Sequence, residues 1–230
     1  MSQSNIYIDI GNSAVKWRTL ESDVYSKNVD EFLTSTLPQA DSAWVSAVAN
    51  LNIIEDIKTL FKEFHLVQSQ KNCNNLVVAY DDPSSLGSDR FCAMLGSMNH
   101  FPQRPILLMD IGSAMTFDII DFTGLHQGGL IMPGLASLRK SFTKFETNDL
   151  SVLDTYLASD TENAWKNGTQ AMLISSINNQ IDRFQDKYTD GVVAICGGTV
   201  DKIRSQLPKS IQIFDNLVLD GLECYSQSVG

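Results

Sequence analysis

Two short turns in this chain combine an aspartate, a glycine and a hydroxyl side chain, and this combination could bind a phosphate group. The turns are Asp9-Ile10-Gly11-Asn12-Ser13 and Asp110-Ile111-Gly112-Ser113-Ala114. Glycine has no Cβ, so backbone N–H groups beside it can approach an anion closely, while the aspartate could hold a cation. An ordinary tight hairpin is the alternative for either turn alone. Because the pattern occurs twice, and Gly197-Gly198-Thr199 adds a third glycine turn, we favour phosphate binding for the set.

A second group of residues that could carry chemistry is Gly87-Ser88-Asp89-Arg90. An arginine can hold a carboxylate through two parallel hydrogen bonds, and the aspartate beside it could face a substrate hydroxyl. The alternative is local helix capping, in which Ser88 or Asp89 is the N-cap and Arg90 lies in a solvated first turn. The spacing of these residues alone does not decide between the two interpretations.

Each of the two Asp-x-Gly turns is expected to close a β-hairpin. Apolar residues 6–10 precede the first turn and residues 14–18 alternate after it, and residues 106–111 and 115–121 repeat this arrangement around the second turn. The second copy begins near the middle of the chain. We therefore infer an internal duplication, with an N-terminal lobe over residues 1–103, a C-terminal lobe over 104–230, and a cleft between them.

Strands and helices alternate through the rest of the chain, which predicts the α/β class. The patterns of apolar residues indicate strands over 41–48, 76–79, 128–134 and 192–196, and helices over 53–64, 91–99, 135–143, 162–183 and 200–207, with a possible break in the fourth helix at Asn167-Gly168.

Composition and charge narrow the classes of function. The chain has 230 residues and a formal net charge of −10, so no basic surface is expected for nucleic acid or anionic membranes. The sequence lacks a charged leader, a membrane-length apolar run and the common P-loop, dinucleotide, hydrolase and zinc-protease signatures. Four separated cysteines indicate buried free thiols rather than a disulfide framework or a zinc site. We expect a cytoplasmic protein that binds phosphate through local turns.

The motifs together resemble the type III pantothenate kinases, a family in the superfamily of acetate and sugar kinases, Hsp70 and actin. The resemblance covers nearly the whole chain, in order. Its motifs are Asp9-x-Gly-Asn-Ser with Lys16, Ser46-x-Val48, Tyr80 seven residues before Gly87-x-Asp-Arg, Asp110-x-Gly-Ser-Ala-x-Thr, Gly128-Gly-x-Ile-x-Pro-Gly, Thr161-x-x-Ala164, Gly197-Gly198 and residues 216–222.

The resemblance implies a role for each matching position. Asp89 matches the proton acceptor and Asp110 the ligand of a monovalent cation, K⁺ or NH₄⁺. Ser88 stands where alanine is commoner, Ser113 stands where threonine is usual, and the chain is shorter than many relatives. Lys16 could instead be a surface strand residue. The implied pantothenate-binding residues are Tyr80, Gly87, Ser88, Asp89, Arg90 and Thr161, and the implied ATP-binding residues are Asp9, Ile10, Gly11, Asn12, Ser13, Ala14, Val15, Lys16 and Ser113.

The resemblance also implies a fold and a reaction. The expected fold has two ribonuclease H-like, actin-like ATPase lobes, each with a mixed five-stranded sheet flanked by helices. The expected reaction is the phosphorylation of pantothenate to 4'-phosphopantothenate by ATP with Mg²⁺, the first step of coenzyme A biosynthesis. A homodimer is expected, although the apolar positions in 135–138 and 172–177 that could form its interface could equally be core. The alternatives are a kinase for another small hydroxy acid and a non-catalytic regulatory or binding protein with this fold.

Overall fold

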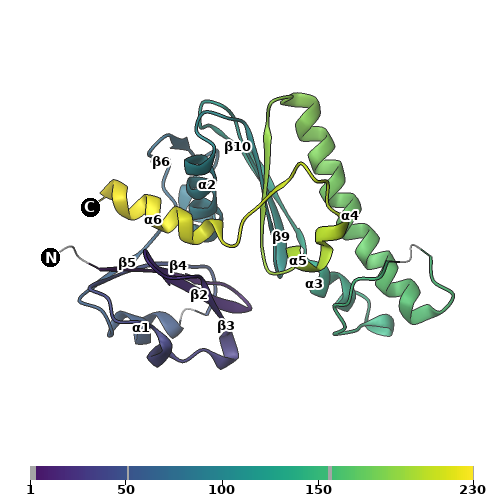
Figure 1. The fold of residues 1–230 in the computed structure, drawn as a ribbon, viewed down its shortest axis with the longest axis horizontal. Helices are drawn as coiled ribbons and strands as arrows, with labels where there is room; N and C mark the ends of the chain where they lie inside the picture. Colours follow the sequence, from purple (N-terminus) through teal and green to yellow (C-terminus); the bar gives the residue numbers. More distant parts are fainter. Residues whose placement is uncertain (1–3, 51, 155–156, 230) are drawn as a thin grey trace. The chain divides into compact units, whose positions relative to one another are not determined.

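Two five-stranded sheets with the same strand order form the framework of the protein (Figure 1). The structure is a computed structural model that describes residues 4–50, 52–154 and 157–229. In each sheet the first strand in chain order is central. The second and third strands lie on one side of it, and the fourth and fifth lie on the other. The first sheet has the order β3 (Tyr25–Asn28), β2 (Ala14–Thr19), β1 (Asn5–Ile10), β4 (Ser42–Ala47), β5 (Glu63–Leu66), and the second has β10 (His126–Pro133), β9 (Ala114–Ile120), β8 (Ile106–Ile111), β11 (Val192–Cys196), β12 (Gln212–Ile213).

Both sheets are mixed. In the first, β1 pairs antiparallel with β2 and parallel with β4. In the second, β11 pairs parallel with both β8 and β12, while the neighbours β8 and β9 are joined by only two residues, which requires an antiparallel pair. The prediction of two mixed five-stranded sheets flanked by helices is therefore confirmed.

The contacts of the chain divide it into two compact units. The first comprises Met1–Gln103, Ile120–Gly128 and Asp215–Gly230, and the second comprises Arg104–Ile119 and Gly129–Phe214. The first unit thus includes the C-terminal helix α6 (Leu217–Val229) and the turn between β9 and β10. The division of the chain into an N-terminal lobe over 1–103 and a C-terminal lobe over 104–230 stays a prediction.

Alternation along β1 and β2 gives the two faces of the first sheet different roles. Ile8, Ile10 and Val15 belong to the apolar cluster on one face, together with Ile57 from α1 (Asn52–Lys58). The residues between them in β1 and β2 therefore point to the opposite face. There Tyr7 contacts Ser226 of α6 through their hydroxyl oxygens, 3.2 Å apart. Asp9 belongs to the same set as Tyr7, so the alternation that builds the core also places the acidic side chain of the first turn.

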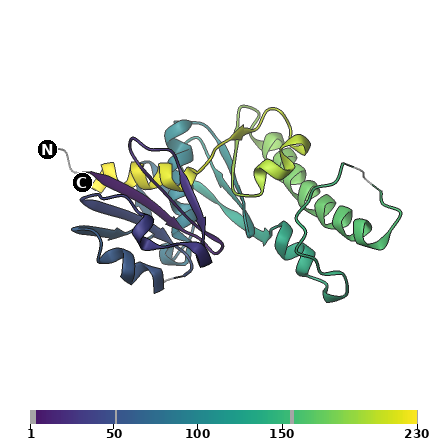
Figure 2. The same ribbon diagram turned by 60° about the horizontal axis from the view of Figure 1, so that its bottom comes forward.

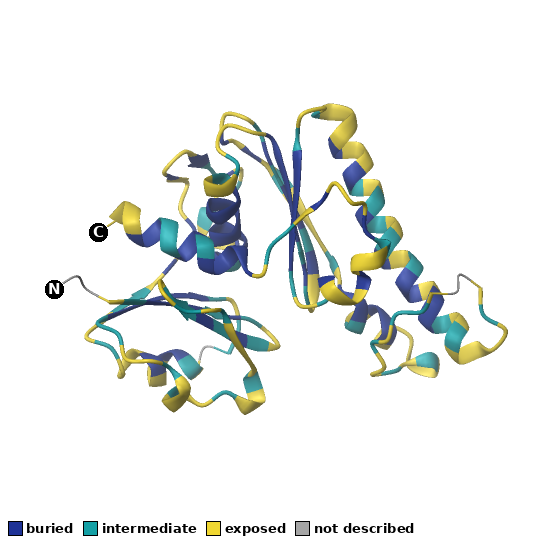
Figure 3. Ribbon diagram, in the orientation of Figure 1, coloured by how far each residue is buried: buried dark blue, intermediate teal, exposed yellow. Residues whose placement is uncertain are grey.

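Two glycines let α6 pack closely against α2 (Ser88–His100), beside which it lies in Figure 1 and Figure 2. A Cβ added to Gly221 would lie 1.7 Å from the carbonyl oxygen of Cys92, and one added to Gly96 would lie 2.4 Å from that of Leu217. Both helices are dark blue where they meet in Figure 3. The close packing holds α2, and hence its first turn, in place.

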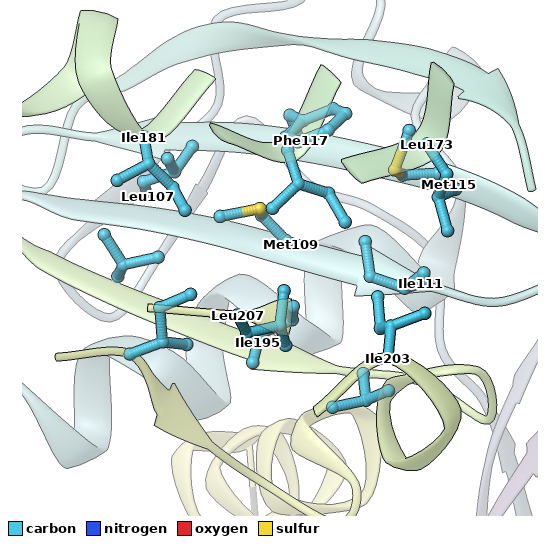
Figure 4. Close-up of a cluster of buried hydrophobic side chains, with 14 of the residues drawn as sticks. Leu107, Met109, Ile111, Met115, Phe117, Leu173, Ile181, Ile195, Ile203 and Leu207 are labelled. Atoms are coloured by element: carbon cyan, nitrogen blue, oxygen red, sulfur yellow. The ribbon is translucent and has the colours of Figure 1, made fainter. Parts of the chain in front are cut away.

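The core of the second unit lies between its sheet and the long helix α4 (Thr161–Lys187). Figure 4 shows Leu107, Met109 and Phe117 from the strands close to Leu173 and Ile181 from this helix. Each such fully buried side chain stabilises the fold by roughly 1.5–3 kcal/mol. This core supports the second Asp-x-Gly turn, which connects β8 and β9. The remaining helices of the unit are α3 (Leu135–Lys140) and α5 (Val200–Ile203).

The structure corrects three predicted elements. The helix predicted over 53–64 ends at Lys58, and Glu63–Leu66 forms the edge strand β5. The strand predicted over 76–79 is reduced to β7 (Leu76–Val77), which pairs with β6 (Asn72–Cys73). Helix α4 runs through Asn167-Gly168 without a break. None of the helices in the described part of the chain has the length and apolar character that crossing a bilayer requires.

Candidate functional site

The first Asp-x-Gly turn is a tight connection whose backbone is held from a neighbouring loop. Gly11 donates its N–H to the carbonyl oxygen of Ala14 at 3.0 Å. In the register of the hairpin, Asp9 of β1 lies opposite Lys16 of β2. The Asn50 amide donates to the carbonyl oxygen of Gly11 at 2.8 Å. Asn50 has φ 54°, a left-handed conformation that asparagine adopts more readily than most residues. Sequence reasoning missed Asn50, because this contact depends on the packing of distant segments.

Asp9 lies on the same side of the first unit as Asp89. Burial raises the pKa of the Cys92 thiol well above its usual range, and the negative charges of Asp9 and Asp89 raise it further. Asp9 lies opposite Ser46 in the parallel pairing of β1 and β4, and the Ser46 hydroxyl lies 3.0 Å from that of Ser88, the residue before Asp89. The first turn and the beginning of α2, which sequence analysis assigned to different substrates, thus lie near each other within this unit.

The Gly87-Ser88-Asp89-Arg90 segment forms the start of α2, with Gly87 as its N-cap. The Asp89 carboxylate folds back and accepts the backbone N–H of Arg90 at 2.7 Å. A Cβ on Gly87 would lie 2.4 Å from Asp89 Oδ1, so a larger residue here would displace the Asp89 carboxylate. A carboxylate in the first turn is also favoured by the helix dipole. The capping alternative is therefore wrong in its residues, because Gly87, and not Ser88 or Asp89, is the N-cap, and Arg90 is buried rather than solvated.

Ser88 ties this helix terminus to the end of β4. Its hydroxyl lies 3.0 Å from that of Ser46 and accepts the N–H of Ala47 at 3.2 Å. Both serines are buried. Ser88 was predicted to contact pantothenate, and its hydroxyl is occupied by these contacts within the protein.

We expect Ser88→Ala to lower the free energy of unfolding by about 1 kcal/mol, because a buried hydrogen-bonded network loses one partner. Turnover should change little, since alanine is common at this position in the family that the sequence resembles. Urea denaturation measures the stability, with exposed Ser85→Ala as the control. An unchanged denaturation midpoint in Ser88→Ala would contradict the prediction.

Arg90 and Tyr80 are linked directly. Arg90 is 7% exposed, and its Nη1 donates to the Tyr80 hydroxyl at 3.0 Å. The guanidinium carbon lies 5.7 Å from the centre of the Tyr80 ring. A buried guanidinium held by an aromatic ring is suited to bind a planar carboxylate.

Three glycine motifs meet at the second turn, within the second unit. A Cβ on Gly197, whose φ is +114°, would lie 2.5 Å from both Asp110 Oδ1 and the Ile111 nitrogen. A Cβ on Gly134 would lie 2.1 Å from the carbonyl oxygen of Gly112, and Ser137 donates its hydroxyl to the carbonyl oxygen of Ser113 at 3.1 Å. The structure thus brings together Asp110, Ser113 and Gly197. Sequence reasoning did not include Gly134 among the site residues, although it belongs to a motif that the resemblance identified.

Thr161 is the exposed first residue of α4 and follows the N-cap Asp160. One turn further, Lys166 Nζ lies 2.5 Å from the Asp149 carboxylate and 2.7 Å from that of Glu162. Asp149 belongs to a loop whose carbonyl oxygens at Asp149 and Ser151 accept hydrogen bonds from the buried Arg139 guanidinium. These contacts attach the loop to the helix terminus that carries Thr161. Within the described residues, His, Cys, Asp and Glu side chains form no group of three or more that could hold a metal ion.

The Lys166 contact makes stability depend on pH in the acid range. Hydrogen bonds from the Lys166 ammonium and from Ser151 hold the pKa of the Asp149 carboxyl well below its usual range, which is about 3.9 in an unfolded chain. The contribution is therefore present above about pH 4 and is lost as the pH falls through the lowered pKa. We expect Lys166→Met to melt at a lower temperature at pH 7 and to lose less stability on acidification. Thermal melts from pH 7 to pH 3 test this, with exposed Lys187→Met as the control, and parallel pH profiles for wild type and Lys166→Met would contradict it.

The fold is that of the actin-like ATPases and sugar kinases. Its features are two sheets of equal strand order, each with an Asp-x-Gly turn after its first strand. Similar solved structures include a candidate Baf family transcriptional activator from Campylobacter jejuni, with 21% identity, a TM-score of 0.64 and coverage of 96% of this chain and 97% of that one. They also include MreB5 of Spiroplasma citri bound to ADP, with 11% identity, a TM-score of 0.53 and coverage of 99% and 97%.

The family follows from sequence comparison. The model of the type III pantothenate kinases matches residues 5–183, and the chain belongs to this family. A type III pantothenate kinase of Colwellia psychrerythraea is 27% identical over 96% of this chain and 99% of that protein. The predicted family, the kinase activity and the ATP-dependent phosphorylation of pantothenate in coenzyme A biosynthesis are thereby confirmed.

Proposed function

We propose that the start of α2 binds and activates pantothenate, with Asp89 as the proton acceptor and Arg90 as the clamp for the pantothenate carboxylate. The observation that carries this proposal is the arrangement of two adjacent side chains at one helix terminus. Arg90 is buried and held by Tyr80, while the Asp89 carboxylate is fixed by the backbone of its own helix. A substrate with a carboxylate and a primary hydroxyl can use both groups.

Asp89 is suited to phosphoryl transfer even though an ordinary aspartate is a weak base. The transition state is loose, so the attacking hydroxyl needs orientation more than early deprotonation. An aspartate carboxylate can then accept the proton late in the step. Asp89 binds the hydroxyl hydrogen, the pantothenate oxygen forms its bond to the γ-phosphorus, and ADP leaves with the electrons of the broken bond.

The phosphates of ATP are assigned to the turn Asp9–Lys16, with Ser113 contributing a hydroxyl. The support is the glycine at each turn and the position of Lys16 opposite Asp9 in the hairpin. A chain with a net charge of −10 supplies little positive charge to a triphosphate. Mg²⁺ bound to ATP, and a monovalent cation at Asp110, would supply that charge when bound. The support for the cation site is that the Asp110 carboxylate is held closely beside Gly197, where a Cβ would lie 2.5 Å from Asp110 Oδ1.

Coupled ADP release with pantothenate, measured with and without K⁺, tests the proposed reaction and its cation together. We expect pantothenate-dependent turnover that K⁺ increases. Turnover with other small hydroxy acids at equal concentration measures the selectivity of the Arg90 clamp. An absence of pantothenate-dependent turnover in both salts would overturn the proposed reaction, and equal turnover in both salts would overturn the cation site alone.

We further propose that the enzyme is a homodimer that uses the exposed face of α4. Ala164, Gly168 and Met172 follow one another at helical spacing and are exposed, Met172 by 56%. A Cβ on Gly168 would meet nothing within 4 Å, so this face can accept a second helix. Thr161 lies on the same face, which would bring the predicted pantothenate contact to the interface. The cytoplasmic location stays a prediction.

Gly168→Glu is expected to convert the dimer to a monomer, because it places a charge in a close helix contact. The helix itself should tolerate the change, since glycine is about 1 kcal/mol worse than other residues inside a helix. Light scattering after size exclusion measures the mass against the 25.5 kDa of one chain. Gln185→Glu, exposed on another part of α4, should keep the wild-type mass. A Gly168→Glu protein of wild-type mass, or a monomeric wild type, would exclude this interface.

A further inference from the structure

His126, at the start of β10, is a buried residue to which the proposed mechanism gives no role. It is 1% exposed. Its ring is stacked with that of Tyr80, with 6.0 Å between the ring centres and 15° between the planes. This distance and angle are those of an offset aromatic pair. Both residues lie in the first compact unit, so the stack is part of one folded body.

The backbone brings His126 to this position through the turn between β9 and β10. Gly124, with φ +88°, approaches Asn75 so closely that a Cβ would lie 2.0 Å from the Asn75 carbonyl oxygen. Val77 donates its N–H to the carbonyl oxygen of Gly124 at 3.0 Å and forms a bridge with Leu125. The turn is thus attached to the segment that leads to Tyr80. His126 follows this turn directly, so backbone contacts fix its position.

The ring of His126 is also held at its edge. Its Nδ1 accepts the N–H of Ala79, the residue before Tyr80, at 3.4 Å. Lys71 donates to the Tyr80 carbonyl oxygen at 3.0 Å. The main chain on both sides of the Tyr80 side chain is therefore attached, and the Tyr80 ring rests against His126. From the other end of the ring, the Tyr80 hydroxyl accepts the Arg90 hydrogen bond of 3.0 Å.

We propose that His126 is a positioning residue for pantothenate binding: it holds the Tyr80 ring, and Tyr80 in turn holds the guanidinium of Arg90 in the direction of the substrate carboxylate. This inference rests on the proposed role of Arg90 as the clamp. A free arginine side chain has many conformations. An arginine that is already held by Tyr80 loses less conformational entropy when pantothenate binds. His126 does not itself touch the substrate. Its effect is on affinity for pantothenate and not on the phosphoryl-transfer step.

Two variants separate the ring of His126 from its hydrogen bond. His126→Asn keeps a polar acceptor and removes the aromatic face, while His126→Phe keeps the face and removes the acceptor. We expect His126→Asn to raise the KM for pantothenate about ten-fold, the upper range for loss of one aromatic pair. The KM for ATP and kcat should stay within about two-fold of wild type, because ground-state binding alone is changed. His126→Phe should restore most of the affinity for pantothenate.

The matched control is His65→Asn, which removes the other stacked histidine of the first unit. The ring of His65 is stacked on that of Trp44, with 3.9 Å between ring centres, whereas the described stacking partner of Tyr80 is His126, so the KM for pantothenate should not change. The second control is a double-mutant cycle with Tyr80→Leu. Once Tyr80 is gone, His126→Asn should add less than about two-fold. An unchanged KM in His126→Asn, fully multiplicative effects in the cycle, or equal losses in kcat and in affinity for both substrates would each overturn the proposal.

A spectroscopic measurement distinguishes failure of this inference from failure of the clamp. In protein with ¹³C-labelled tyrosine rings, the Tyr80 signal is assigned by its loss in Tyr80→Phe. We expect this signal to shift or broaden in His126→Asn and to stay near its wild-type position in His126→Phe. If Arg90→Lys leaves the KM for pantothenate unchanged, the clamp is wrong, and the Tyr80 signal still reports whether His126 holds the ring. An unaltered signal in His126→Asn would overturn the positioning role itself.

Discussion

Asp89→Asn is expected to lower kcat by about 10²–10⁴-fold, the range for loss of a general base. An amide of the same shape can still accept the Arg90 backbone N–H, a bond that the carboxylate makes at 2.7 Å, so the start of α2 should remain folded. It cannot accept the proton of the pantothenate hydroxyl. The KM values for pantothenate and ATP should therefore change much less than kcat.

The control for this variant is Asp81→Asn, an exposed aspartate in the loop before α2. It removes the same charge from the same unit and should keep wild-type kinetics. Circular dichroism and thermal melting establish that both variants are folded. A kcat for Asp89→Asn within about ten-fold of wild type would show that Asp89 is not the proton acceptor.

Asp110→Asn is expected to lower kcat/KM for ATP by about 10²-fold or more, because it removes a full charge that would hold a cation near the phosphates. Gly197 packs closely against Asp110 and the Ile111 backbone. This packing leaves little room for a neighbouring carboxylate to move into the place of the Asp110 carboxylate. The increase in turnover with K⁺ should disappear in this variant. Initial rates over a range of K⁺ concentrations, at constant ionic strength, measure both effects.

Asp186→Asn, on the exposed end of α4 in the same unit, provides the charge-matched control. It should retain the K⁺ response of the wild type. Retention of that response by Asp110→Asn would place the monovalent cation elsewhere. A loss of turnover with an intact K⁺ response would instead indicate that Asp110 acts on the phosphates and not through the cation.

The elements that sequence patterns predicted best are those with two independent signals. The hairpin of β1 and β2 has an apolar strand, a glycine turn and an alternating strand in succession, and its bounds differ from the prediction by one residue at most. The helix over 53–64 was too long because its second half rested on apolar residues alone. Phe64 lies in the edge strand β5, and short apolar runs do not distinguish strand from helix.

The helix α6 shows a second kind of difficulty. Its sequence was used as a family motif and was not assigned a structure, although residues 217–219 and 221–222 are all buried. When a segment is apolar on several sides, its sequence indicates burial but does not distinguish a helix from a strand. Only its contact with α2 through Gly221 shows why so many of its residues are covered and why a glycine stands in the middle of a helix.

The sequence by itself determined the chemistry that neighbouring residues carry. A glycine beside an aspartate, or an arginine beside one, brings its groups together through the chain, so the turn at Asp9, the turn at Asp110 and the pair Asp89 and Arg90 could all be identified. The pairing of the two strands in each hairpin follows from the same local patterns, whereas the order of the other strands in the two sheets was not predicted.

The tertiary structure decided which distant residues hold that chemistry in place. Asn50 on the first turn, Ser46 against Ser88, Gly134 against the second turn, and His126 beneath Tyr80 are contacts between segments far apart in the chain. Such contacts depend on how buried surfaces pack, and no local pattern of residue types encodes them.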